Sequence, residues 1–112
     1  MRRKFAVILI LISVAGRVTA SPAPGDICIG NATADPYFFT IDAGDGNRRS
    51  GELLPGGMLC LAGAAAKTGV AAAFVDENVL EGCSRLMKSA NMARLLRYDG
   101  VDRCEWEMVR HE

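Results

Sequence analysis

Four cysteines restrict how this 112-residue chain can fold more than any other feature of its sequence. They are Cys28, Cys60, Cys83 and Cys104, and an even number of cysteines in a small exported chain indicates disulfide bonds. In the loop-entropy model each bond contributes about 3 to 4 kcal/mol, a large share of the stability of a small domain. Four cysteines allow three pairings. We favour the nested pairing, Cys28–Cys104 with Cys60–Cys83, and keep the sequential pairing, Cys28–Cys60 with Cys83–Cys104, as the alternative.

Export is predicted by the first twenty residues. A basic start, Arg2-Arg3-Lys4, precedes an apolar run from Phe5 to Val14, and Val18-Thr19-Ala20 has small residues where a signal peptidase cuts. The apolar run is too short for a transmembrane helix, which needs about 20 such residues. The sequence therefore predicts a cleaved signal helix over 1–20, a flexible lead over 21–25 and a single disulfide-stapled domain over 26–112.

Removal of the signal peptide changes the charge of the chain. The full sequence has 13 Lys and Arg against 13 Asp and Glu, and four of the bases lie in residues 1–20. The remaining 9 bases and 13 acids give a mature net charge of −4. Nucleic acids bind through clustered Lys and Arg, so they are excluded as partners, and a stable membrane anchor is not expected after processing. We expect a periplasmic or secreted monomer whose partner is an envelope or secreted protein.

Short strands separated by Gly and Pro turns dominate the rest of the sequence. The predicted strands lie within 26–33, 37–42, 53–62, 69–76 and 102–109. In the last of them Cys104, Trp106 and Met108 alternate with the polar Arg103, Glu105 and Glu107, as in a half-buried strand. The fold class predicted is all-β: a small antiparallel sandwich or barrel-like sheet with two disulfides. Asn31-Ala32-Thr33 is a glycosylation sequon, which we interpret as an ordinary strand end.

Two segments fit either a helix or a strand. Residues 61–73 are rich in alanine but are interrupted by Gly63 and Gly69. Residues 89–98 begin with a plausible Ser89 cap and contain good helix formers, so a short helix is possible there. We favour a strand for both segments, by only a small margin for the second.

The stretch TIDAGDGNRRSGE, residues 40–52, raises the question of a metal loop. A calcium EF-hand loop needs oxygen ligands at alternating positions and a glutamate at the twelfth, and no register starting at Asp42 or Asp45 provides them. Asp-Gly is a favoured pair in tight hairpin turns. We therefore predict a hairpin turn, with Arg48 and Arg49 as possible contacts for an anion or a partner.

Catalytic and cofactor chemistry finds little support in the sequence. The single histidine, His111, lies next to the C-terminus, and no Cys-x-x-Cys motif is present. The cysteines are too widely spaced for a zinc ribbon. Asp76, Glu77 and Glu81 form a local acidic group, which we interpret as solvated surface. No catalytic residue, metal ligand or cofactor is predicted.

Two arginines near cysteines form the remaining candidate site. Arg85 follows Cys83, and Arg103 precedes Cys104. If the two stretches lie side by side, these guanidinium groups form an anion-recognition patch, because Arg suits bidentate contact with carboxylate or phosphate. The plainer interpretation is two surface ion pairs, Glu81 with Arg85 and Asp102 with Arg103.

These observations favour an exported accessory module that binds a protein or ligand, or has a structural role in the cell envelope, without being an enzyme. One alternative is a small secreted hydrolase or thiol-redox enzyme. Another is an inhibitor of a secreted enzyme that presents the 42–51 loop.

Overall fold

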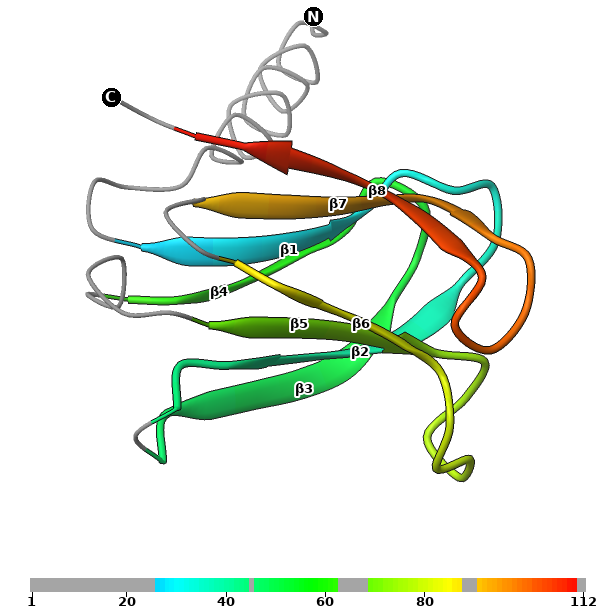
Figure 1. Ribbon diagram of the computed structural model, residues 1–112, viewed down its shortest axis with the longest axis horizontal. Coiled ribbons are helices and arrows are strands. Elements are labelled where there is room, and N and C mark those ends of the chain that lie inside the picture. Colours follow the sequence, from blue (N-terminus) through cyan, green and yellow to red (C-terminus); the bar gives the residue numbers. More distant parts are fainter. Residues whose placement is uncertain (1–25, 45, 63–68, 88–90, 111–112) are drawn as a thin grey trace, which may run out of the picture.

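The computed structural model describes residues 26–44, 46–62, 69–87 and 91–110, which form two packed four-stranded sheets (Figure 1). One sheet has the strand order β4-β1-β7-β8 and the other the order β3-β2-β5-β6. The strands are β1 (Ile27–Asn31), β2 (Tyr37–Asp42), β3 (Arg48–Leu53), β4 (Met58–Leu61), β5 (Val70–Phe74), β6 (Cys83–Leu86), β7 (Met92–Tyr98) and β8 (Cys104–Val109). All neighbours pair antiparallel except β1 and β7, which are parallel.

The core lies between the sheets and follows from the two-residue period of a strand. Ile27 and Ile29 of β1 face Phe39 and Ile41 of β2 across the interior, and all four are fully buried. Small side chains on β5, Ala71 and Ala73, also belong to this core. On β8 the expected alternation is confirmed: Cys104, Trp106 and Met108 pack against the core, whereas Glu105 and Glu107 are exposed.

The all-β sandwich with two disulfides is confirmed, and no helix occurs in the described residues. The helix considered for 89–98 is wrong, because Met92–Tyr98 forms β7 with Ala93 and Leu95 pointing into the core. Val70–Phe74 is a strand, as favoured. Residues 63–68 and 88–90 lie outside the described residues, as do the predicted signal peptide and lead, Asp45 and His111.

The nested disulfide pairing is wrong. Cys28 bonds to Cys60, and Cys83 bonds to Cys104. The first bond joins directly opposite residues of neighbouring antiparallel strands, in the register Cys28↔Cys60. Cys28 and Cys104 cannot pair because β7 lies between β1 and β8 in the same sheet. The sequential alternative is therefore the correct one.

Both open sides of the sandwich are closed by contacts between edge strands. On one side the Cys83–Cys104 disulfide joins β6 of one sheet to β8 of the other. On the opposite side the chain itself passes from β3 to β4, and Arg49 Nη1 donates a hydrogen bond to the Cys60 carbonyl oxygen at 3.0 Å. These links hold the two sheets together at their edges, where a two-layer sandwich has the least apolar contact.

Asn31 organises the connections that follow β1 and β3. Its side chain is buried, and its Nδ2 donates to the carbonyl oxygens of Asp35 and Leu53, both at 2.8 Å. Its Oδ1 accepts hydrogen bonds from the backbone N–H of Thr33 at 2.9 Å and from the Thr33 hydroxyl at 2.7 Å. Both amide hydrogens are thus used inside the fold, so Asn31 has a structural role that leaves no place for a glycan.

Substitution of Asn31 by alanine is expected to destabilise the fold more than an ordinary surface change. The substitution leaves the Leu53 carbonyl without a side-chain donor in a buried setting, which costs about 1 to 3 kcal/mol. Chemical denaturation monitored by Trp106 fluorescence measures this loss. The control is Asn78→Ala, an exposed position, where we expect a change within about 0.5 kcal/mol. Equal effects of the two substitutions would contradict the role given to Asn31.

Candidate interaction surface

Four connections meet at one end of the sandwich, which we call the acidic end: residues 32–36, 54–57, 75–82 and 99–103. They meet there because β1, β3, β5 and β7 all run toward that end, on the right in Figure 1. The four connections contain six acidic residues, Asp35, Asp76, Glu77, Glu81, Asp99 and Asp102, and one basic residue, Arg103. The end therefore carries a strong excess of negative charge.

The β5–β6 loop, residues 75–82, is shaped by its own polar groups. The carboxylate of Asp76 accepts a hydrogen bond from the backbone N–H of Asn78 at 2.7 Å, an arrangement typical of an Asx turn. The turn directs the following residues outward, and Leu80 is 93% exposed. The loop then returns to β6 through Gly82, where an added Cβ would lie 2.1 Å from the Ala73 carbonyl oxygen. Only glycine fits at this position.

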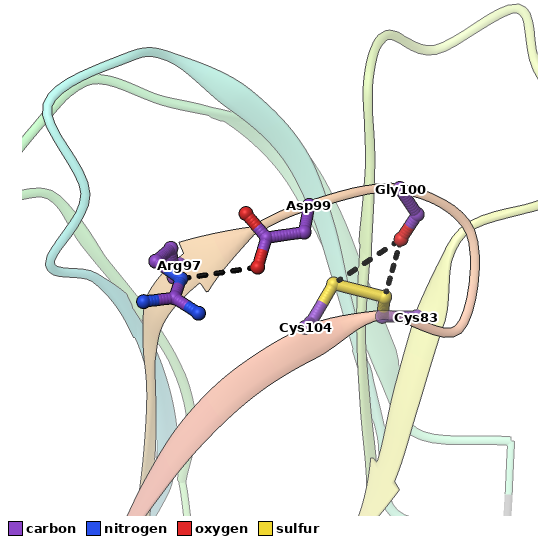
Figure 2. The surroundings of a disulfide bond; sticks show 5 residues. All are labelled: Cys83, Arg97, Asp99, Gly100 and Cys104. Atoms are coloured by element: carbon purple, nitrogen blue, oxygen red, sulfur yellow. Dashed lines mark hydrogen bonds and ion pairs between the residues drawn. A yellow bond between two sulfur atoms is a disulfide. The ribbon is translucent and has the colours of Figure 1, made fainter.

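The β7–β8 loop, residues 99–103, is a tight turn held by backbone hydrogen bonds. The Asp99 N–H donates to the Arg103 carbonyl oxygen, and the Arg103 N–H donates to that of Gly100, both at 2.9 Å. Asp102 adopts a positive φ of 60°, a conformation that Asp and Asn tolerate better than most residues. An exposed ion pair between Arg97 and Asp99, 3.0 Å long, lies at the start of the loop (Figure 2).

The two loops are fixed to each other. The Cys83–Cys104 disulfide joins the strands that begin where the loops finish, and the Asp102 N–H donates to the Gly82 carbonyl oxygen at 3.2 Å. Figure 2 shows the Gly100 carbonyl oxygen facing the disulfide, 3.3 Å from the Cys83 sulfur and 3.9 Å from the Cys104 sulfur. Because sulfurs in a disulfide carry no hydrogen, these are close S···O contacts. The loops therefore form one rigid surface.

Aliphatic side chains gather on this surface. Besides Leu80, the exposed fractions are 55% for Val75, 44% for Val101 and 38% for Val79. Together with Tyr98 these four residues line one open depression of about 500 Å³. Single exposed aliphatic residues are common, but a contiguous apolar patch with a polar rim is typical of an interaction site.

Two further depressions border the same loop. One, of about 480 Å³, is lined by Phe74, Leu80, Val101 and the carboxylates of Glu81 and Asp102, among others. The other, of about 350 Å³, includes Phe38, Val75 and the acids Glu52, Asp76 and Glu77. The Phe38 and Phe74 rings, 6.4 Å apart, are neighbours on β2 and β5. The β5–β6 loop is thus bordered by hollows whose linings combine apolar and acidic residues.

Tyr98 lies beneath the apolar patch with an unused polar group. Its ring stacks on Tyr37 at a centroid distance of 4.8 Å, and its hydroxyl oxygen is buried without a hydrogen-bond partner among the described residues. Burial raises the pKa of the Tyr98 phenol above 10.0, and the neighbouring Tyr37 and Asp102 raise it further when they are negatively charged. The hydroxyl is therefore a protonated donor at neutral pH.

The arginines proposed from sequence are not gathered into one site. Arg48 and Arg49 begin β3 beside the hairpin turn, at the end of the sandwich opposite Arg103. The disulfide does bring the Arg85 and Arg103 stretches together, but Arg85 lies along β6 and Arg103 lies in the β7–β8 loop. Within the described ranges neither of them forms an ion pair; the pairs found are Arg94–Glu107, Arg97–Asp99 and Arg97–Glu105. An anion patch at Arg85 and Arg103 stays a prediction.

The predicted hairpin between β2 and β3 is confirmed on both sides of Asp45, which itself lies outside the described residues. β2 and β3 pair in the register Asp42↔Arg48, and the Ala43 N–H donates to the Asn47 carbonyl oxygen at 2.9 Å. Gly44 and Gly46 both adopt positive φ angles, 88° and 86°. Across the described part of the chain, no group of three or more His, Cys, Asp or Glu side chains is arranged to hold a metal ion.

The apolar patch was missed in the sequence because its members come from two loops that residues 83–98 separate. One signal of an exposed apolar site is present in the sequence. Val79 and Leu80 are adjacent aliphatic residues in a polar stretch, 75–82, that lacks the alternation of a strand. The acids Asp76, Glu77 and Glu81 were identified, but as solvated surface alone. Their association with exposed aliphatic side chains depends on the Cys83–Cys104 bond, which the favoured pairing excluded.

Comparison with known proteins gives no match: no family model, no curated protein and no solved structure is significantly similar to this chain. Within the described residues there is no helix with the length and hydropathy needed to span a bilayer. The two disulfides are compatible with an extracellular or periplasmic location.

Loss of the second disulfide is expected to release the two loops. The double variant Cys83→Ala/Cys104→Ala should lose about 3 kcal/mol of stability by the loop-entropy model. Under conditions where it remains folded, a glutamate-specific protease should cleave after Glu77 and Glu81, as identified by mass spectrometry. The matched variant Cys28→Ala/Cys60→Ala should retain protection at both sites, because its disulfide lies within one sheet. Equal cleavage of both variants would contradict the rigid surface described above.

Titration of Tyr98 provides a check on its environment. In a Tyr37→Phe variant, absorbance at about 295 nm should show Tyr98 ionising above its ordinary pKa of 10.0. Because the folded-state pKa is raised, the protonated phenol favours the folded state. That contribution is complete below the unfolded pKa and disappears as the pH rises through the folded one. A midpoint at or below 10.0 would show that the hydroxyl is solvated.

Proposed function

We propose that this chain is an exported, non-enzymatic module that binds a protein partner of the cell envelope or the secreted fraction through its acidic end. The leader predicted over residues 1–20 and the two disulfides support export. The observation that carries the binding role is the rigid presentation of Leu80, 93% exposed, within an aliphatic patch.

Binding is favoured because the exposed aliphatic patch gains free energy when a partner removes it from water. Burial of apolar surface contributes about 25 cal/mol per Å², so four aliphatic side chains covered together provide a useful part of a binding free energy. The β5–β6 and β7–β8 loops are cross-linked before binding, so little conformational entropy is lost when the partner docks. A rigid apolar centre with a polar border is also the common anatomy of protein interfaces.

Site-specific photo-crosslinking in the producing cell tests the proposal. A photoreactive residue replaces Leu80 in one strain and Leu86 in another, because Leu86 is also well exposed, at 58%, but lies on β6 away from the acidic end. We expect one discrete heavier adduct from position 80 and none from position 86. Adducts of equal yield at both positions, or none at position 80, would overturn the proposal.

A single substitution at the same position is expected to separate binding from folding. Leu80→Ser should change the free energy of unfolding by less than about 0.5 kcal/mol, because the side chain is almost fully exposed. With the photoreactive residue placed at Val101 on the neighbouring loop, the same substitution should abolish or strongly reduce the adduct. Denaturation curves and immunoblots provide the two measurements. An undiminished adduct would show that Leu80 is not part of the contact.

A further inference from the structure

The charges around the apolar patch indicate which kind of partner fits it. Among the described residues, the three depressions that border the β5–β6 loop are lined by five different acidic residues and by no lysine or arginine. These are Glu52, Asp76, Glu77, Glu81 and Asp102. The described charged residues that line these depressions are therefore all negative.

In the part of the chain that the structure describes, three carboxylates outside the patch lie close to arginines, whereas Glu81 and Asp102 do not. On the outer face of β7 and β8, Arg94 lies 3.4 Å from Glu107, and Arg97 lies 3.9 Å from Glu105. Among the described residues, neither Glu81 nor Asp102 has such a partner. Because a backbone hydrogen bond joins Asp102 to Gly82, the residue after Glu81, the two carboxylates stay close in the fold and their fields add over the hollow that both line.

We infer that the acidic end binds a polypeptide segment of the partner in which lysine or arginine residues flank one large apolar side chain. This inference rests on the proposed binding role and names the chemistry of the partner. The apolar side chain enters the hollow beside Leu80 and Val101, and the cations meet Glu81 and Asp102 at its border.

The same charges argue against other occupants. Nucleic acids and anionic lipid surfaces are repelled by uncompensated carboxylates, and so is a segment with acidic flanks. A second copy of this chain would bring an equally acidic end to the contact. A small polyamine satisfies the carboxylates but leaves the aliphatic side chains exposed.

Three synthetic peptides of equal length test the inference by calorimetry with the processed, oxidised protein. The first alternates Lys with Leu and Phe, the second has Glu in place of Lys, and the third has Ser in place of Leu and Phe. We expect measurable binding of the first peptide alone. Its affinity should fall at least about tenfold between about 20 mM and 300 mM salt, because screening weakens exposed charge interactions.

Matched charge variants identify the site. Glu81→Gln/Asp102→Asn removes two negative charges from the acidic end, and asparagine tolerates the positive φ of Asp102. Glu105→Gln/Glu107→Gln removes the same number from the outer face of β8. We expect the first double variant to weaken binding of the Lys-containing apolar peptide about tenfold or more, and the second to leave it within about twofold, since screening limits the reach of exposed charges.

Several outcomes would overturn the inference. These are equal binding of all three peptides, equal effects of the two double variants, competition by spermidine as strong as that of the apolar cationic peptide, or a mass in solution that doubles with concentration. If position 80 forms an adduct in cells but the cationic peptide does not bind, the proposed function stands and the partner chemistry is wrong. If neither occurs, both are wrong.

Discussion

The bond between Cys83 and Cys104 is the constraint on which the rest of this structure depends. It is the disulfide that links the two sheets, and it lies at the edge formed by β6 of one sheet and β8 of the other. The Cys28–Cys60 bond has a different role, because it reinforces a strand pair that is already hydrogen-bonded. A sandwich of this size buries a limited core, so a link between layers has more effect on its shape than one within a layer.

The Cys83–Cys104 bond also determines whether the loops of the acidic end form one continuous surface. Without it the β5–β6 and β7–β8 loops would be connections of two separate sheets, each with exposed aliphatic residues and acids. With it they form a continuous surface. The Asp102–Gly82 hydrogen bond also joins the loops, and Gly82 has no side chain that would collide with the backbone of Ala73. Rigidity of this kind is costly to maintain on a surface that has no contact to make. It is useful where a partner must be bound without ordering the loops first.

The sequence predicts the strands that are rich in apolar residues and misses two polar edge strands. Tyr37–Asp42 and Cys104–Val109 alternate apolar and polar residues, and both were placed correctly. Arg48–Leu53 and Cys83–Leu86 were not recognised as strands, because as edge strands they bury only one side chain each, Leu53 and Cys83. The pairing of the cysteines failed for a related reason: it depends on strand order, and the insertion of β7 between β1 and β8 is a long-range event. The apolar patch could not be found before that order was known.

The position of β1 has a consequence for how the protein is made. In β1, Ile29 is opposite Leu59 of β4 on one side and Ala93 of β7 on the other. The first strand therefore obtains both of its hydrogen-bonded neighbours from residues far along the chain. Contacts of such high sequence separation form slowly, because a long loop must close before any of them is gained. Sheet assembly therefore waits until most of the polypeptide has been synthesised. The sheet that contains β1 can close only after β7, its parallel neighbour, has been made.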